Sequence, residues 1–363
     1  MKFSLSKQVL LDGLNKVTGV VSTRPSMPIL ANVMIQAENG ELTLTTTNME
    51  LTIVAKVPCL VTTPGTVTLP AKKLQSIIRE MRDGEVTVEV KGTVASIRCN
   101  RALFRLNGLA AADFPGLPQF REPREFKVPQ SMLNKGLRYT EYAISTDNTR
   151  YVLNGIYTCF RDAKLTLVAT DGRRLALFEN ELEFPESQQV SIVVPTRAVA
   201  EVHRLLSDDH GEVLVRVMPN MAAFDFGDTL LVTKLIDGNY PNYRQVIPSH
   251  YNERITMRAG ELSETVRRVA LLATEKSNTV RFHFTPGLME VQSSADVGEA
   301  NEETPIDYQG RELTITFNAD FILAPLKAVG DTEVSLDLID SSSPGLMRVA
   351  DEFMYVIMPM HSA

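Results

Sequence analysis

The sequence predicts an α+β protein built from three tandem repeats of one domain, each with two helices and an antiparallel sheet. The first observation is a strand-like segment, Gly-Glu-Val-Thr-Val-Glu-Val, at residues 84–90, which returns at 211–217 and, with one residue inserted, at 330–338. The second is that an apolar-periodic, helix-like segment precedes each copy. The spacing is about 120 residues, the length of a whole domain, so the chain repeats domains and not short solenoid units.

Each repeat is expected to begin with a short strand followed by a helix. Those strands are expected at residues 2–5, 125–128 and 254–257. In the next segment apolar residues recur at three- and four-residue spacing, as at Leu10, Leu14 and Val17, which is the period of an α-helix. A second helix comes later in each repeat. The helices are expected at residues 6–18, 71–82, 130–142, 196–206, 260–272 and 319–329.

The repeated strand alternates apolar and polar residues. Val86, Val88 and Val90 are predicted to face a core while the residues between them face water. Lys91-Gly92 is a plausible tight turn into a partner strand at residues 94–99. We expect the two helices of each repeat to pack on one face of the antiparallel sheet.

Length and composition fit three ordinary domains. The chain has 363 residues, of which 44% are hydrophobic, so each repeat can bury a normal core. We place the domains at residues 1–121, 122–248 and 249–363. Cys59, Cys99 and Cys159 are odd in number and lie in strand-like apolar contexts, which favours buried free thiols in a reduced, cytoplasmic setting. Neither a signal peptide nor a membrane span is predicted, because polar residues interrupt every apolar run.

The charge distribution is uneven. The net charge is −7, which by itself speaks against nucleic acid. The predicted helices nevertheless carry a positive net charge, so the rest of the chain is more acidic than the total. If the helices share one side, that side attracts phosphate. The alternative is that helices simply favour Lys and Arg.

No motif for catalysis, cofactor or metal stands out. The five histidines are far apart, and no pair has the spacing that brings two ligands to one metal. The sequence has no phosphate-binding loop, no dinucleotide fingerprint and no Gly-x-Ser-x-Gly elbow. We therefore expect no cofactor and no metal, and the repetition favours a binding or scaffold protein over an enzyme.

Several motifs in one order match a known family. They are Met1-Lys2-Phe3, Arg24-Pro25-x-x-Pro28-Ile29-Leu30, Ala111-Ala112-Asp113-Phe114-Pro115, Tyr151-Val152-Leu153-Asn154-Gly155, Ala169-Thr170-Asp171-Gly172-Arg173-Arg174-Leu175, Asp237-Gly238-x-x-Pro241-x-Tyr243-Arg244, Glu275-Lys276 and Val356-Ile357-Met358-Pro359-Met360. In these the chain resembles the beta subunits of bacterial DNA polymerase III, the sliding clamps, over essentially its whole length.

The resemblance implies a fold and a function. It implies a head-to-tail homodimer of six similar domains closing into a ring, with helices lining the hole and duplex DNA passing through it. The ring would tether the replicative polymerase, the clamp loader and other proteins with clamp-binding linear motifs, without base readout. The family name can place such chains among nucleotidyltransferases by association, but we expect no chemistry here. One alternative is a three-domain protein-binding scaffold without DNA encirclement; another is an enzyme with a site at a domain junction.

For DNA, the resemblance and the basic helices select seven residues. They are Arg24, Lys72, Lys73, Arg150, Tyr151, Arg197 and Arg204. Arg24 lies in a Pro-flanked loop, and the helical cations are expected to face the hole. The alternative for each cation is an ordinary solvated surface residue.

For partner peptides, the resemblance implies an apolar pocket between the second and third domains. The matching residues are Leu153, Thr170, Gly172, Arg173, Arg174, Leu175, Pro241, Val246, Asn318, Phe321, Ser342, Val356, Met358, Pro359 and Met360. Methionines adapt to varied ligands, although this apolar terminal stretch also reads as a final core strand. Departures from better-known members, which bear on peptide preference, are Arg173, Gln245, Ser277 and the tail His361-Ser362-Ala363.

For the seam of the ring, the resemblance implies an apolar interface with flanking charges. Its apolar residues are Phe104, Leu106, Leu271 and Leu272. Its charged residues are Lys73 and Arg101 on one side and Glu299, Glu302 and Glu303 on the other. The alternative is that Phe104 and Leu106 are ordinary core residues of an alternating strand.

Overall fold

The structure is a computed structural model that describes residues 1–22, 24–118, 120–207, 211–273 and 278–360. Glu275, Lys276, Ser277 and the tail at residues 361–363 therefore lie outside the described residues. The α-helices are α1 (Lys7–Val17), α2 (Ala71–Glu80), α3 (Gln130–Thr140), α4 (Thr196–Leu205), α5 (Ala259–Val269) and α6 (Ala319–Val329). All six fall where the sequence predicted a helix.

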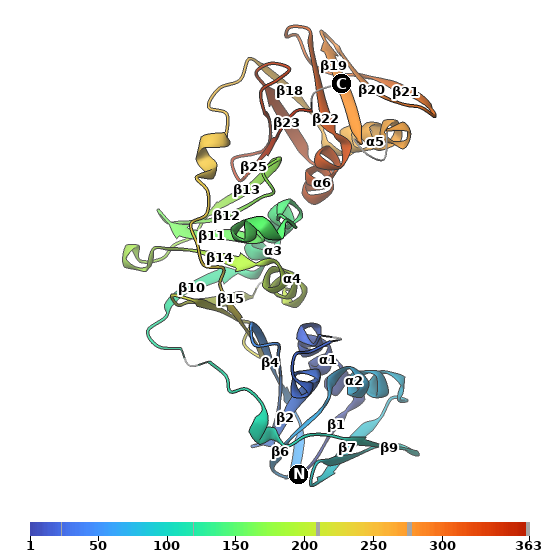
Figure 1. Ribbon diagram of the computed structural model, residues 1–363, viewed down its shortest axis with the longest axis vertical. Coiled ribbons are helices and arrows are strands. Elements are labelled where there is room, and N and C mark those ends of the chain that lie inside the picture. Colours follow the sequence, from blue (N-terminus) through green and yellow to red (C-terminus); the bar gives the residue numbers. More distant parts are fainter. Residues whose placement is uncertain (23, 119, 208–210, 274–277, 361–363) are drawn as a thin grey trace. The chain divides into compact units, whose positions relative to one another are not determined.

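The strands follow the same order in each repeat, a strand and a helix, then strands, a second helix and three strands (Figure 1). The first repeat has β1 (Lys2–Ser6), β2 (Asn32–Glu38), β3 (Glu41–Thr47), β4 (Leu51–Pro58), β5 (Leu60–Thr63), β6 (Gly65–Pro70), β7 (Glu85–Lys91), β8 (Val94–Cys99) and β9 (Ala102–Asn107). The second has β10 (Arg124–Pro129), β11 (Gly155–Arg161), β12 (Lys164–Thr170), β13 (Arg174–Glu181), β14 (Val190–Pro195), β15 (Glu212–Val217), β16 (Met221–Asp225) and β17 (Thr229–Lys234). The third has β18 (Glu253–Arg258), β19 (Thr279–Thr285), β20 (Leu288–Ala295), β21 (Gly298–Pro305), β22 (Leu313–Asn318), β23 (Glu333–Leu338), β24 (Gly345–Val349) and β25 (Phe353–Ile357). The predicted threefold repetition is confirmed.

The repeats share their sheets. Strand β17 pairs with β4, which joins strands of the second and first repeats in one sheet of order β10-β15-β16-β17-β4-β3-β2-β6. Strand β13 pairs with β25, which joins the second and third repeats in the order β14-β11-β12-β13-β25-β24-β23-β18. The outer repeats each keep a further sheet, β5-β1-β7-β8-β9 and β21-β20-β19-β22.

Through these shared sheets the three repeats pack into two compact units. The first comprises residues 1–131 and 200–235, and the second comprises residues 132–199 and 236–363. Each unit contains one eight-stranded sheet and one outer sheet, so the middle repeat gives half of its strands to each unit. Sequence periodicity could not predict this division, because it depends on pairing between strands of different repeats.

The local signals behind the helices and turns are clear. Ser6 caps α1, since its hydroxyl accepts a hydrogen bond from the Val9 amide at 3.3 Å. The valines of β7 are buried as predicted. The predicted turn is off by one residue: Lys91 pairs with Val94, so the turn residues are Gly92-Thr93, and Gly92 takes the positive φ of 59° that such a turn needs.

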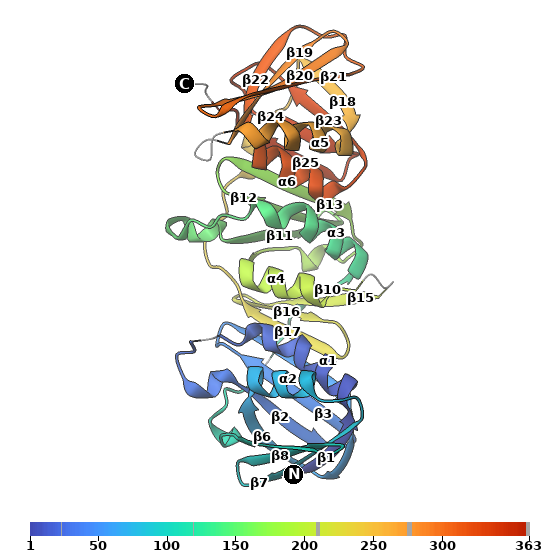
Figure 2. The ribbon, with the colours of Figure 1, turned by 90° about the vertical axis from the view of Figure 1, so that its right-hand side faces the viewer.

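The helices of a repeat pack together, but they do not share one sheet face everywhere. Helix α1 contacts β3 and β4, and α2 contacts β2 and β6, so both lie on the same eight-stranded sheet. In the third repeat α5 contacts β20 and β21 of the outer sheet and β18 of the eight-stranded sheet, while α6 contacts β22 of the outer sheet and β25 of the eight-stranded sheet. Figure 2 shows α5 and α6 side by side. The expectation of a single helix-bearing face is confirmed for the first repeat, whereas in the third repeat both helices contact both sheets.

The cysteines differ from one another in burial. Cys99 in β8 and Cys159 in β11 are buried free thiols, as predicted. Cys59 is only half-buried and lies between β4 and β5, so the prediction of a buried strand thiol is wrong there. The reason is that the chain bends at this position to pass from one sheet to the other. Every helix among the described residues is too short or too polar to cross a lipid bilayer.

Candidate functional sites

Helix α2 presents a row of cations to solvent. Lys72 and Lys73 are exposed in its first turn, while Leu74 beside them is buried. Arg79, which the sequence analysis did not select, follows Lys72 by seven positions and therefore shares its side of the helix. Within the described part of the chain no carboxylate forms an ion pair with these three side chains, so their charges are open to a ligand.

The other DNA-contact candidates of the first unit, Arg24 and Arg204, differ in how far their side chains are already bound within the chain. Arg24 is exposed in the loop before the 3-10 turn Pro28–Ala31. Arg204 is exposed, but its guanidinium group is hydrogen-bonded within the chain. It donates to the carbonyls of Asn15 (2.9 Å) and Lys16 (2.6 Å) and forms an ion pair with Glu201 at 2.7 Å. Arg204 therefore holds α4 against the end of α1, and it is less available to a phosphate than the α2 lysines.

The second unit contributes three more DNA candidates. Tyr151 is 58% exposed, and Arg150 beside it forms an ion pair with Asp147 at 3.1 Å. The hydrogen bonds that Asp147 accepts from Thr149 and Arg150 lower the pKa of its carboxyl group, so the pair stays charged. Arg197 is exposed in the first turn of α4.

A buried apolar cluster lies under the predicted peptide pocket. Its members are Val168, Leu175, Leu177, Leu346 and Val356, from strands of the shared sheet in the second unit. Leu175 pairs directly with Val356 across the junction of β13 and β25, so two predicted pocket residues from different repeats are neighbours. The segment after β17 covers the cluster through Tyr240, Tyr243 and Ile247.

Arg174 links the two repeats beside this cluster. Its Nε donates to Asp171 at 3.1 Å, and its Nη2 donates to the carbonyl of Tyr142 at 2.7 Å. The guanidinium group lies 4.5 Å from the centre of the Phe321 ring, a favourable cation–π contact. Gly172 has a φ of +87°, which only glycine adopts without strain, and lets the turn from β12 reach Arg174.

The remaining pocket residues border this arrangement. Asn318 caps α6 by accepting a hydrogen bond from the Phe321 amide at 3.2 Å. Val246 is 50% exposed and Met358 is 44% exposed, so both offer apolar surface. Val356 is buried in β25, whereas Met358 follows the strand, with its amide donating to the Arg173 carbonyl at 3.0 Å. The terminal segment is therefore a core strand at its start and an accessible surface at its end.

A small turn shapes one wall near Ser342. The Asp340 carboxylate accepts hydrogen bonds from the amides of Ser342 (2.8 Å) and Ser343 (2.7 Å). These bonds stabilise the charged form and lower the pKa of Asp340 to about 2. Leu153 and Leu175 are buried, Thr170, Pro359 and Met360 are half-buried, and Gly172, Arg173 and Pro241 are exposed.

Two edge strands, one in each unit, carry part of the predicted seam. Phe104 and Leu106 lie on β9, Glu299, Glu302 and Glu303 lie on β21, and Leu271 and Leu272 lie in the 3-10 turn Ala270–Leu272. Strand β9 ends its sheet, and its Phe104 is 40% exposed, so Phe104 is not a core residue. Leu103, which was not among the predicted seam residues, is 45% exposed on the same strand. Strand β21 ends the other outer sheet, and Leu271 near it is 80% exposed.

The charged residues of the predicted seam differ in whether their charge is already paired within the chain. Glu302 forms an ion pair with Arg268 at 2.6 Å and accepts a hydrogen bond from Thr265, so its charge is already matched within the chain. Glu299 and Glu303 lie on the same edge strand. Lys73 and Arg101 are exposed in the first unit.

No metal centre is evident in the described residues, because no three His, Cys, Asp or Glu side chains converge there. The accessible features in the described residues are a cationic helix surface, exposed sheet edges and exposed apolar side chains such as Val246 and Met358, which are features of a binding protein.

Comparisons with known proteins agree over the whole chain. Three protein-family models match: the N-terminal domain of the DNA polymerase III beta subunit at residues 1–118, its central domain at 127–242 and its C-terminal domain at 244–361. The "Beta sliding clamp" of Pseudomonas aeruginosa is 32% identical over 365 residues, covering 99% of this chain and 100% of that protein. The one from Escherichia coli K12 is 32% identical over 368 residues, with the same coverage.

Solved structures show the same similarity. The sliding clamp of Pseudomonas aeruginosa bound to griselimycin has a TM-score of 0.96 at 32% identity. The sliding clamp of Bacillus subtilis has a TM-score of 0.96 at 28% identity. Each comparison covers 100% of both chains.

Proposed function

We propose that this chain, which belongs to the DNA polymerase III beta subunit family, is a DNA sliding clamp. In this role it encircles duplex DNA as a homodimer and tethers the replicative polymerase during DNA replication. The tether raises the concentration of the polymerase at the primer end, which is the physical basis of processivity. The role is non-catalytic and requires neither a cofactor nor a metal.

The observation that carries the proposal is that β9 and β21 each form one edge of an outer sheet in the described residues, with predicted seam residues on both. An exposed sheet edge invites pairing with another chain. The edge strand β9 carries the exposed apolar residues Leu103 and Phe104, the edge strand β21 is acidic, and the two belong to the first and third repeats of the chain. Head-to-tail pairing of β9 with the β21 edge of a second copy satisfies both edges. Two such contacts close a ring of six domains, with domain boundaries at 1–121, 122–248 and 249–363.

The cations of α2 support contact with DNA. Exposed lysines on a helix attract phosphates without reading bases, which permits sliding. We propose Lys72, Lys73 and Arg197 as the principal contacts, with Arg24, Arg150 and Tyr151 as further contacts. Arg204 acts mainly in holding α4 to α1.

Exposed apolar residues at the predicted pocket support the binding of partner peptides. Val246 and Met358 offer exposed apolar surface, and the half-buried Phe321 ring lies against the guanidinium group of Arg174. We propose that the polymerase, the clamp loader and other proteins with clamp-binding linear motifs use this pocket in turn, in the cytoplasm. A scaffold that binds proteins without encircling DNA would share the pocket but has no use for the cationic helices.

Retention on circular DNA tests encirclement. Protein loaded by the host clamp loader onto a nicked circle should stay bound through gel filtration and should be released when the DNA is cut once. The variant Phe104→Asp should be monomeric and should not be retained on the circle. Leu117→Asp is the control, because it alters a similarly accessible residue (45% exposed) outside β9, and it should behave as the parent does. Equal retention on linear and circular DNA would favour the scaffold alternative.

The pocket is tested by peptide affinity. Met358→Ala and Val246→Ala should each weaken the clamp-binding peptide of the host polymerase about tenfold, because each loses buried contact with the ligand. Val297→Ala, at an 82% exposed turn position, is the control. Removal of residues 359–363 should also weaken the peptide, and unchanged affinity in all three variants would refute the site.

A further inference from the structure

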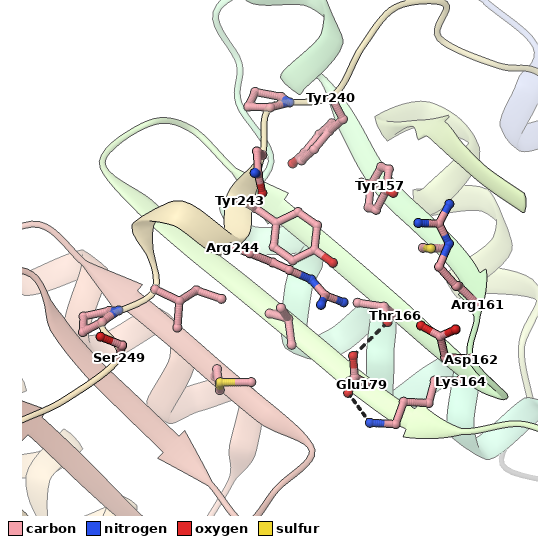
Figure 3. A pocket seen from close by; sticks show the side chains of 17 residues that line it. Tyr157, Arg161, Asp162, Lys164, Thr166, Glu179, Tyr240, Tyr243, Arg244 and Ser249 are labelled. Atoms are coloured by element: carbon pink, nitrogen blue, oxygen red, sulfur yellow. Dashed lines mark hydrogen bonds and ion pairs between the residues drawn. The ribbon is translucent and has the colours of Figure 1, made fainter.

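A second, charged pocket lies on the same sheet face as the predicted peptide pocket. It has a volume of about 780 Å³, and all of its lining residues belong to the second unit. Tyr157, Arg161 and Lys164 border it from the sheet, and Tyr243 and Arg244 border it from the segment that crosses over (Figure 3). Among the residues named for the peptide pocket, only Pro241 also lines this one.

Strand register places the two pockets in one line. Thr170 pairs with Leu175, which pairs with Val356, and this row lies in the predicted peptide pocket. Side chains two and four residues along a strand share its face. On β12 the same face therefore continues from Thr170 through Val168 and Thr166 to Lys164.

The far end of that face is polar. Thr166 pairs with both Cys159 and Glu179, and Lys164 pairs with Arg161. The face thus changes from apolar to charged across six residues of β12, a distance of about 20 Å at the rise of a strand. The stacked rings of Tyr157 and Tyr240, 5.0 Å apart, lie between the two ends.

The charges of this second pocket are not balanced. The Glu179 carboxylate is already matched, because it pairs with Lys164 at 2.7 Å and accepts a hydrogen bond from Thr166 at 3.1 Å. Arg161 and Arg244 are exposed, and in the described residues neither forms an ion pair with a carboxylate. Asp162 at the rim is the one other acidic residue of the lining, so a positive charge is left over.

Resting on the proposed function, we propose that this pocket, lined by Arg161 and Arg244, binds acidic residues that flank the apolar motif of a partner peptide. Two guanidinium groups bind carboxylates with directed hydrogen bonds. An extended chain covers about 20 Å in roughly six residues, so the acidic residues stand about that far from the apolar anchor. The pocket would then discriminate among partners that share one motif.

The test uses synthetic probes. The clamp-binding peptide of the host polymerase is compared with versions that carry six added Glu or six added Gln residues at either end, by fluorescence anisotropy. At low salt the Glu extension at one end should bind about three- to tenfold more tightly than its Gln counterpart, the range of two exposed ion pairs. High salt should remove the difference.

Variants assign the effect to the pocket. The double variant Arg161→Gln with Arg244→Gln should abolish the preference for Glu while leaving the affinity of the unextended peptide unchanged. Arg281→Gln, an exposed arginine on β19, should preserve the preference. If the unextended peptide binds but Glu and Gln extensions bind equally, this inference is wrong and the proposed function stands. If the unextended peptide does not bind, the peptide pocket itself fails.

Discussion

Neutralising three cations should change how DNA binding responds to salt. The variant combines Lys72→Gln, Lys73→Gln and Arg197→Gln. All three side chains are exposed on the first turns of α2 and α4, and the buried positions of these turns are untouched. The substitutions should therefore leave the apolar packing of both helices intact.

The magnitude follows from counterion release. Each phosphate contact contributes about 0.9 to the slope of log affinity against log salt concentration, so loss of three contacts should reduce that slope by about 2 to 3. The affinity for a fluorescent duplex, measured by anisotropy over a range of salt concentrations, gives the slope directly. The parent and the variant should converge at high salt.

A matched control separates location from net charge. Lys127→Gln, Lys234→Gln and Arg98→Gln remove the same charge from exposed strand positions. This control should keep the parental slope. A control that loses as much slope as the helix variant would mean that only net charge matters, and an unchanged slope in the helix variant would refute the assignment of these residues.

Three further predictions concern stability and chemistry. Asp337 is 3% exposed and forms ion pairs with Arg254 (2.6 Å) and Arg348 (3.2 Å). Asp337→Asn should therefore lower the free energy of unfolding, measured by urea titration, by about 2 kcal/mol. A loss under about 0.5 kcal/mol would contradict this. The pKa of Asp340 is lowered to about 2, so its stabilising effect is complete above the unfolded pKa near 4 and is lost as pH falls through 2. The stability difference between the parent and Asp340→Ala should accordingly vanish at the acid end, and a constant difference would be the contrary result. Half-buried Cys59 should be the first thiol to react with a thiol reagent, and it should react slowly because burial raises the pKa of its thiol. Cys59→Ser should remove this first reaction phase. Equal reaction rates for all three thiols would contradict the prediction.

The sequence by itself determined the elements and their repetition. Helices follow from three- and four-residue apolar spacing, and strands such as β7 follow from alternation, because both signals are local. Lys72 and Lys73 were predicted as exposed helical cations, and their environment in α2 agrees. The resemblance to a known family supplied the residues of the pocket and the seam, which no local pattern could supply.

Only the tertiary structure decided how the elements combine. The pairing of β17 with β4 and of β13 with β25, which divides the middle repeat between two units, joins residues far apart in the chain. Other long-range contacts bind the Arg204 side chain to a carbonyl at the end of α1 and pair Leu175 with Val356. They also bring Arg161 and Arg244 to one pocket, where neither forms an ion pair with a carboxylate of the described residues. Periodicity fixes which face of an element is apolar, but which faces and edges meet depends on the summed packing of the whole chain.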